Sequence, residues 1–237
     1  MTTRFASWLP ALVILSGAAS IVADIGLLPA SAVFVFKPLT TLLVIGWAWP
    51  RGDNEPTARR WIRAGLLMSL LGDVFLLWPQ QGFLPGLVSF SLAHLAYIAA
   101  FTRSTRLGAR LSPFAFYLLV GAGVLMWLWP GVPAPLQLAL LAYVACLITM
   151  AAQAAVVWQL ARGSPVEPLA RRAAIGGALF VLSDALLAVN RFAMPLPSAP
   201  LLILAPYWAA QVLIAGSLAR RVSSPPCAPT APRAGRR

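Results

Sequence analysis

Apolar stretches of membrane-spanning length recur along the whole chain and restrict its fold more than any other feature. A helix needs about 17–25 residues to cross a bilayer, at a rise of about 1.5 Å per residue. Eight such stretches are separated by proline, glycine or arginine clusters. They run over Ser7–Leu28, Ser31–Trp49, Trp61–Trp78, Gly82–Phe101, Ser112–Trp129, Ala134–Leu160, Leu169–Val189 and Ala199–Ala219. The sequence therefore predicts an all-α, polytopic membrane protein with eight transmembrane helices in one bundle.

The composition supports the same class of protein. The chain is 60% hydrophobic and only 10% charged, whereas soluble domains carry about 25% charged residues. This excludes an ordinary globular domain and a disordered chain. The net charge of +12 would indicate nucleic-acid binding in a soluble protein. In a membrane protein, arginine-rich loops on one face explain it better, and no nucleic-acid partner is expected.

The basic residues are concentrated between alternate stretches. One basic residue precedes the first apolar stretch, and five follow the eighth. Four lie around the connection from the second stretch to the third, three around that from the fourth to the fifth, and three around that from the sixth to the seventh. Only Lys37 and Arg191 lie near the opposite face. The positive-inside rule then predicts a cell (inner) membrane protein with both termini cytoplasmic. Residues 1–222 would form the membrane domain, and the Pro-, Ala- and Arg-rich residues 223–237 a disordered basic tail.

Two aspartates interrupt otherwise apolar stretches: Asp73 in SLLGDVFLLWP and Asp184 in LSDALLAVNRF. A charge at the centre of a membrane helix costs about 2.5–3.5 kcal/mol on insertion scales, so each carboxyl group needs a partner or a task. Gly65 precedes the first aspartate by eight residues, and Gly176 precedes the second by eight. This short repeat suggests two parallel four-helix halves.

Other polar residues are predicted to lie inside the bundle, with the charged ones in its outer half and His94 and Tyr97 near mid-membrane. The candidates for substrate binding are Lys37, His94, Tyr97, Asn190, Arg191, Tyr207 and Gln211. Several also have a structural interpretation. The lysine could neutralise an aspartate, and His94 could be a hydrogen-bonded packing residue. Tyr97, Tyr207 and Gln211 could form interhelical hydrogen bonds worth about 0.6 kcal/mol on average.

Motifs of soluble enzymes are missing from the sequence, which contains no GxSxG, HExxH or P-loop. The single histidine excludes a multi-histidine metal site, so neither a metal nor a cofactor is expected. The two aspartates fit a hydrolase and a proton-coupled transporter equally well. A third interpretation is a scaffold protein whose ionic groups only hold helices together.

Five segments, taken together, resemble the YhhN-like lysoplasmalogenases. They are KPLTT (Lys37–Thr41), GLLMSLLGDVFLL (Gly65–Leu77), FSLAHLAYIAAF (Phe90–Phe101), GALFVLSDALLAVNRF (Gly177–Phe192) and PYWAAQVLI (Pro206–Ile214). The resemblance implies an integral-membrane hydrolase that uses water to cleave the vinyl ether bond of lysoplasmalogens. The products would be a fatty aldehyde and glycerophosphoethanolamine or glycerophosphocholine. It also implies that Asp73 and Asp184 are the catalytic residues, and it favours the hydrolase over the transporter.

The chemistry of a vinyl ether agrees with two carboxyl groups. The bond hydrolyses by protonation at carbon, which gives an oxocarbenium ion that water captures. One carboxylic acid and one carboxylate suit this reaction, as they do in glycosidases. A low dielectric favours the neutral carboxyl group, and a neighbouring carboxylate favours it further, so a shared proton is expected. We expect Lys37 or Arg191 to hold the phosphate. We expect water and glycerol hydroxyls to be oriented by His94, Tyr97, Tyr207 and Gln211.

Overall fold

The computed structural model describes residues 2–219, which form eight α-helices, two short 3-10 helices and no β-strand. The helices are α1 (Thr2–Asp24), α2 (Val33–Ala48), α3 (Pro56–Phe75), α4 (Phe83–Phe101), α5 (Leu111–Leu128), α6 (Ala134–Ala161), α7 (Glu167–Phe192) and α8 (Ala199–Ala215), with η1 (Ala30–Ala32) and η2 (Trp129–Gly131) between them. The predicted all-α class is confirmed, and each predicted stretch coincides with one α-helix. The predicted tail, residues 223–237, lies outside the described residues.

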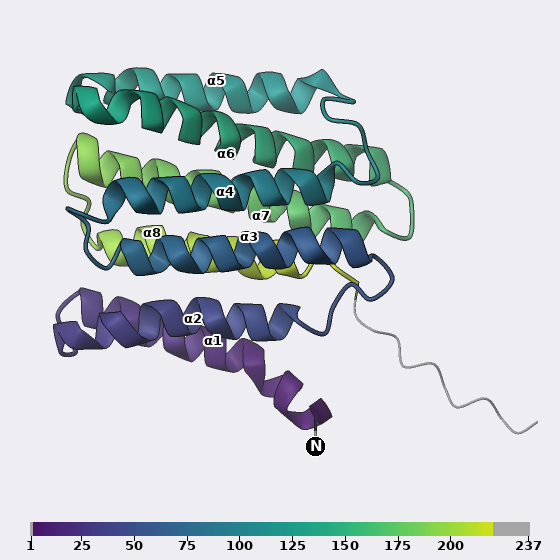
Figure 1. Cartoon of the computed structure of the whole chain (residues 1–237), viewed down its shortest axis with the longest axis horizontal. Coiled ribbons are helices and arrows are strands. Elements are labelled where there is room, and N and C mark those ends of the chain that lie inside the picture. The colour runs from purple at the N-terminus through teal and green to yellow at the C-terminus, as the bar shows by residue number, and fades with distance from the viewer. Residues whose placement is uncertain (1, 220–237) are drawn as a thin grey trace, which may run out of the picture.

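Consecutive helices run in opposite directions, so the connections alternate between the two ends of the bundle (Figure 1). The connections 49–55, 102–110 and 162–166 lie at one end, together with the start of α1 and the end of α8 (Figure 1). We call this the arginine-rich end, because all three connections contain arginine. The opposite end carries the other four connections, which contain none.

Proline and glycine mark several helix boundaries. Proline occupies the first turn of α3, α6, α7 and α8, where its missing N–H needs no helical partner. Gly163 follows α6 with φ +75°, a left-handed conformation that glycine adopts without strain. Helix α3 begins at Pro56, earlier than predicted, because a helix can continue beyond the apolar layer into water.

Small residues allow the closest helix contacts, which join α3 to α4 and α7 to α8. A Cβ atom at Gly65 would lie 2.2 Å from the ring of Tyr97, and one at Gly176 would lie 3.0 Å from the carbonyl oxygen of Ala210. Glycine at both positions lets the neighbouring helix approach, as in other membrane bundles. The two glycines singled out in the sequence therefore have a packing role.

Large apolar side chains cover the outside of the bundle. Leu119, Met126 and Leu138 are between 74% and 79% exposed, and many other leucine, tryptophan and phenylalanine side chains share that surface. Soluble monomers rarely expose contiguous apolar areas of this extent. Within residues 2–219, five helical segments are long and apolar enough to cross a membrane. The chain is a multi-pass membrane protein.

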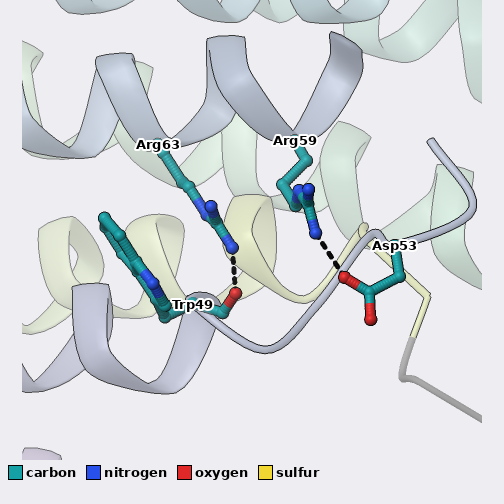
Figure 2. Close-up of polar contacts among 4 residues, drawn as sticks. All are labelled: Trp49, Asp53, Arg59 and Arg63. Atoms are coloured by element: carbon teal, nitrogen blue, oxygen red, sulfur yellow. Dashed lines mark hydrogen bonds and ion pairs between the residues drawn. The ribbon is translucent and has the colours of Figure 1, made fainter. Parts of the chain in front are cut away.

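Polar contacts at the arginine-rich end fix the α2–α3 connection (Figure 2). Arg63 of α3 donates a hydrogen bond to the carbonyl oxygen of Trp49, and its guanidinium carbon lies 4.3 Å from the centre of that indole ring. One turn earlier, Arg59 forms a salt bridge with Asp53 (Figure 2). Arginine and tryptophan are typical of membrane–water interfaces, so this end is suited to lipid headgroups.

Candidate active site

Asp73 lies near the end of α3 and is enclosed by protein. It is 1% exposed. Its Oδ2 accepts a hydrogen bond from the Thr41 hydroxyl of α2 at 2.6 Å and another from the Tyr207 hydroxyl of α8 at 2.8 Å. Thr41 in turn accepts a hydrogen bond from the indole N–H of Trp208, at 3.3 Å. One carboxyl group thus joins three helices.

Asp184 lies on α7 in a more open setting. Its Oδ2 accepts a short hydrogen bond from the Tyr143 hydroxyl of α6, and the residue is only half-buried. No other side-chain hydrogen bond within residues 2–219 reaches this carboxyl group. The predicted pairing of Asp184 with Asp73 through a shared proton stays a prediction, since no hydrogen bond of the described residues joins the two carboxyl groups.

Two small cavities meet at the Tyr143–Asp184 pair. The larger, of about 60 Å³, lies between α5, α6 and α7, and the smaller, of about 30 Å³, between α3, α4, α6 and α7. In the larger cavity every other described lining residue is apolar: valine, leucine, isoleucine, alanine or glycine. The smaller cavity includes Phe83 and Phe192, near the C-terminal end of α7. Among the described side chains, only Tyr143 and Asp184 present polar groups to either space.

A layer of aromatic rings connects the two aspartates. The ring of Tyr207 lies 5.5 Å from that of Phe180, which lies 4.8 Å from the imidazole of His94. The imidazole lies 5.3 Å from the ring of Tyr143. His94 is fully buried, and neither ring nitrogen has a hydrogen-bond partner within the described residues. Buried polar atoms normally have partners, so His94 is a candidate for contact with water or substrate.

Tyr97 and Gln211, also predicted as substrate-binding groups, bind each other instead. The Tyr97 hydroxyl donates to Oε1 of Gln211 at 2.7 Å, and both side chains are fully buried. This hydrogen bond links α4 to α8. It lies in the same interior as the aromatic layer, because Gln211 is one helical turn after Tyr207 on α8.

The three remaining predicted groups lie toward the end of the bundle opposite the arginine-rich end. Lys37 is half-buried on α2 and is attracted electrostatically by Asp73, without a salt bridge in residues 2–219. Arg191 is exposed and does not line the smaller cavity, but its guanidinium carbon lies 4.0 Å from the centre of the Phe83 ring, which does. The Asn190 side chain accepts a hydrogen bond from the Leu196 backbone at 2.9 Å, so it fixes the α7–α8 connection.

Sequence reasoning missed Thr41 and Tyr143, the hydroxyl donors from α2 and α6. The depth of the two residues in the bundle could have indicated that Tyr143 pairs with Asp184. Asp184 lies eight residues before the end of α7, and Tyr143 lies nine residues after the start of α6, both counted from the same end of the bundle. Within residues 2–219 no group of three histidine, cysteine, aspartate or glutamate side chains is arranged to hold a metal ion.

Comparison with known proteins places the chain in a family. No solved structure matches it. The sequence profile of the YhhN family matches residues 32–218. The chain belongs to the YhhN family. All helices from α2 to α8, and with them both aspartates and their hydroxyl donors, lie within the matched region.

Curated relatives of this YhhN-family chain include proteins from mammals and bacteria. Lysoplasmalogenase TMEM86B of Sus scrofa is 38% identical over 165 residues, which cover 67% of this chain and 63% of that protein. The Homo sapiens protein of the same name is 34% identical, over 78% of this chain and 74% of that protein. A lysoplasmalogenase of Mycobacterium bovis is 28% identical, over 73% and 66%. The match thus spans slightly less than two thirds of the Sus scrofa protein.

Proposed function

We propose that this chain is a lysoplasmalogenase, a membrane hydrolase that cleaves the vinyl ether bond of a lysoplasmalogen. The products are a fatty aldehyde and glycerophosphoethanolamine or glycerophosphocholine. The observation that carries the proposal is the Tyr143–Asp184 pair, which supplies the polar groups of an otherwise apolar cavity between α5, α6 and α7. Such a cavity suits the reactive end of an alkenyl chain, which must meet a proton donor. The names of the curated relatives support the same activity.

The surroundings of the two aspartates support unequal parts in this reaction. Asp73 accepts two hydroxyl hydrogen bonds and attracts Lys37, interactions that favour a carboxylate. Asp184 accepts one hydrogen bond and has no salt bridge within residues 2–219, so it is better suited to carry a proton. In the proposal Asp184 is the acid, and the negative charge of Asp73 stabilises the cation from deeper in the bundle, where a low dielectric extends its reach.

The reaction then proceeds in balanced steps. The Asp184 carboxyl group gives its proton to the second carbon of the alkenyl chain, and the double-bond electrons form the new C–H bond. This leaves an oxocarbenium ion at the first carbon. A water molecule attacks that carbon and gives a proton to the Asp184 carboxylate, forming a hemiacetal. The hemiacetal collapses to aldehyde and alcohol as its hydroxyl proton moves to the leaving oxygen, and the Asp184 carboxyl group, protonated in the previous step, is ready for the next turnover.

The predicted binding groups receive specific parts in the proposal. The reactive end of the alkenyl chain enters the cavity between α5, α6 and α7, and Arg191, which contacts the Phe83 ring beside the smaller cavity, holds the phosphate. His94 orients the attacking water, because its ring nitrogens are unpartnered in the described residues and its ring lies beside Tyr143. Lys37 acts through Asp73. Tyr97, Gln211, Tyr207 and Asn190 keep the surrounding helices and the α7–α8 connection in place.

In the proposed topology, residues 1–222 cross the inner membrane eight times and both termini lie on its cytoplasmic side. It is supported by the alternation of connections and by the arginines gathered at one end (Figure 1). Single cysteines test it in a background without Cys146 and Cys227. A cysteine at Gln80 is expected to react with an impermeant thiol reagent in intact spheroplasts, and one at Ser104 only after lysis. The reverse pattern contradicts the topology.

The proposed arrangement in two parallel four-helix halves has support from helix neighbours. Contacts of α1 with α2, α2 with α3 and α3 with α4 correspond to those of α5 with α6, α6 with α7 and α7 with α8, and the contact of α4 with α6 corresponds to that of α8 with α2. Tyr97 faces Gly65, and Ala210 faces Gly176. The residues three positions before these partners are His94 and Tyr207, which would then be counterparts.

The activity is tested with purified protein and a lysoplasmenyl-ethanolamine substrate in deuterated water. We expect fatty aldehyde carrying one deuterium on the carbon next to the carbonyl group, and no product from the saturated ether analogue. Aldehyde without deuterium would exclude carbon protonation. Absence of aldehyde from a monodisperse preparation, combined with substrate-dependent proton flux in proteoliposomes, would favour the alternative of a proton-coupled transporter.

A further inference from the structure

A third and much larger cavity lies at the arginine-rich end of the bundle. Its volume of about 670 Å³ falls within the range of about 300–1,000 Å³ that is usual for ligand pockets. Ile62 on α3 and Ala173 on α7 line it. Each precedes the aspartate of its helix by eleven residues, which corresponds to about 16 Å along the helix axis. The cavity is therefore separate from the candidate active site.

One buried side chain fixes a wall of this cavity. Gln153 of α6 is fully buried beneath the α4–α5 connection. Its Oε1 accepts a hydrogen bond from the N–H of Gly108 at 3.2 Å, and its Nε2 donates to the carbonyl oxygens of Thr105 and Arg106, at 3.4 Å each. Because these hydrogen bonds hold the connection in one shape, the cavity is formed in advance of any ligand, which lowers the cost of binding.

The lining combines an apolar floor with one cation and one anion. Most lining residues are alanine, leucine, valine, isoleucine or phenylalanine, and Arg106 and Glu55 are the charged ones among the described residues. No salt bridge or side-chain hydrogen bond in residues 2–219 involves either charged group. Ser104 and Ser164 add hydroxyl groups beside them. Both charges are thus available to a ligand that carries the opposite charges.

We propose that this cavity binds a single-chain lipid with a phosphoethanolamine headgroup, taken from the leaflet at the arginine-rich end. The phosphate would pair with Arg106, since guanidinium groups suit phosphate oxygens. The ammonium group would pair with Glu55, and the acyl chain would cover the apolar floor. A purely anionic head would leave Glu55 opposed to a like charge, and a headgroup without a chain would leave the floor exposed. This site does not depend on the hydrolase proposal.

Binding of ester-linked lysophosphatidylethanolamine to the full-length protein, followed by native mass spectrometry, tests the proposal. The ester-linked probe avoids vinyl ether chemistry. Arg106→Gln is expected to weaken binding about tenfold, the loss of one charge-assisted hydrogen bond. Glu55→Gln is expected to weaken binding of this lipid by a similar factor. It should not weaken binding of lysophosphatidylglycerol, which has no ammonium group. Ala173→Trp should abolish the binding that depends on Arg106 and Glu55, by filling the cavity.

Two control variants distinguish binding in this cavity from binding at the candidate active site or to surface charge. Arg103→Gln removes an exposed arginine of the same connection that does not line the cavity, and it should leave binding unchanged. Asp184→Asn should also leave it unchanged. Equal affinity in wild type, Arg106→Gln and Glu55→Gln overturns the proposal. Loss of binding in Asp184→Asn would place the lipid in the other site, and equally tight binding of free glycerophosphoethanolamine would exclude a lipid as the specific ligand.

Discussion

Asp73 on α3 and Asp184 on α7 each interrupt an apolar run, but their surroundings differ. Asp73 is closed off by two hydroxyl donors from α2 and α8. Asp184 has a single donor among the described residues, Tyr143, and faces two cavities. In the proposed repeat, His94 stands where the other half has Tyr207. Tyr207 donates to its aspartate, whereas the nitrogens of His94 have no partner in the described residues.

The same arrangement, an aspartate that accepts hydrogen bonds from neighbouring helices, can thus contribute to stability at one position and suit catalysis at another. Around Asp73 every partner is supplied by the protein, which stabilises the bundle at a point where three helices meet. In the proposed mechanism, one partner around Asp184 is left for water or substrate, an arrangement that costs stability but provides room for chemistry. The Asp73 region is therefore an internal reference for the Asp184 region. Substitutions at matching positions should affect stability in one and turnover in the other.

The largest expected effect is that of Asp184→Asn on turnover. The amide keeps the volume of the side chain but has no acidic proton, so we expect aldehyde release to fall by about 10²–10⁴-fold, the usual contribution of a general acid–base group. Thermal unfolding in detergent should change little. Measurable turnover close to that of the wild type would remove Asp184 from the mechanism and, with it, the proposed asymmetry.

Asp73→Ala is expected to act mainly on stability. It leaves the hydroxyl groups of Thr41 and Tyr207 buried without their acceptor, at a cost of about 1–3 kcal/mol for each. Thermal unfolding should therefore shift further than in Asp184→Ala, whose aspartate is half-buried with one donor. Activity should fall less than in Asp184→Asn. A fully stable Asp73→Ala protein without activity would instead give Asp73 the leading catalytic part.

The positions of the helices could be predicted from the sequence because hydropathy and breakers act locally. The stretch Gly82–Phe101, bounded by glycine and an arginine-containing loop, is α4 almost to the residue. Differences arise where a helix leaves the apolar layer. Helix α7 continues beyond the predicted Val189 through Asn190 and Arg191 to Phe192, since backbone hydrogen bonds continue whether or not the side chains are apolar.

The candidate site could be predicted only in part, because depth is encoded along a helix but neighbours are not. Asp184 was recognisable as a lone carboxyl group in an apolar run. Its partner Tyr143 could be matched to it in depth only, since a single tyrosine in a long apolar helix gives no sign of which helix it faces. Asn190 was predicted to bind substrate, which stays a prediction, and nothing in the sequence indicated that its side chain accepts a hydrogen bond from the backbone of Leu196. Both outcomes depend on tertiary packing.

His94→Phe should lower activity but not stability, whereas Tyr207→Phe should lower stability more than activity. The new ring keeps the contacts with Phe180 and Tyr143 while removing two buried nitrogens that lack partners in the described residues. We expect turnover to fall by about ten- to a hundredfold and thermal stability to stay the same or rise. Tyr207→Phe should lower stability and leave most of the activity. Equal destabilisation by both changes would mean that His94 is only a packing residue.

The smallest expected effect distinguishes the two hydroxyl donors, Tyr143 and Thr41. Tyr143→Phe keeps the ring beside His94 but frees the Asp184 carboxyl group to rotate, so we expect kcat to fall about tenfold with little change in KM, because orientation is lost and binding is not. Thr41→Val removes the matching donor to Asp73 and should cost about 1 kcal/mol of stability with nearly unchanged kcat. Kinetics and thermal unfolding of both variants, measured side by side, decide the comparison. If Thr41→Val lowered kcat as much as Tyr143→Phe, the two aspartates would share the chemistry equally, and the closed setting of Asp73 would have to open during turnover.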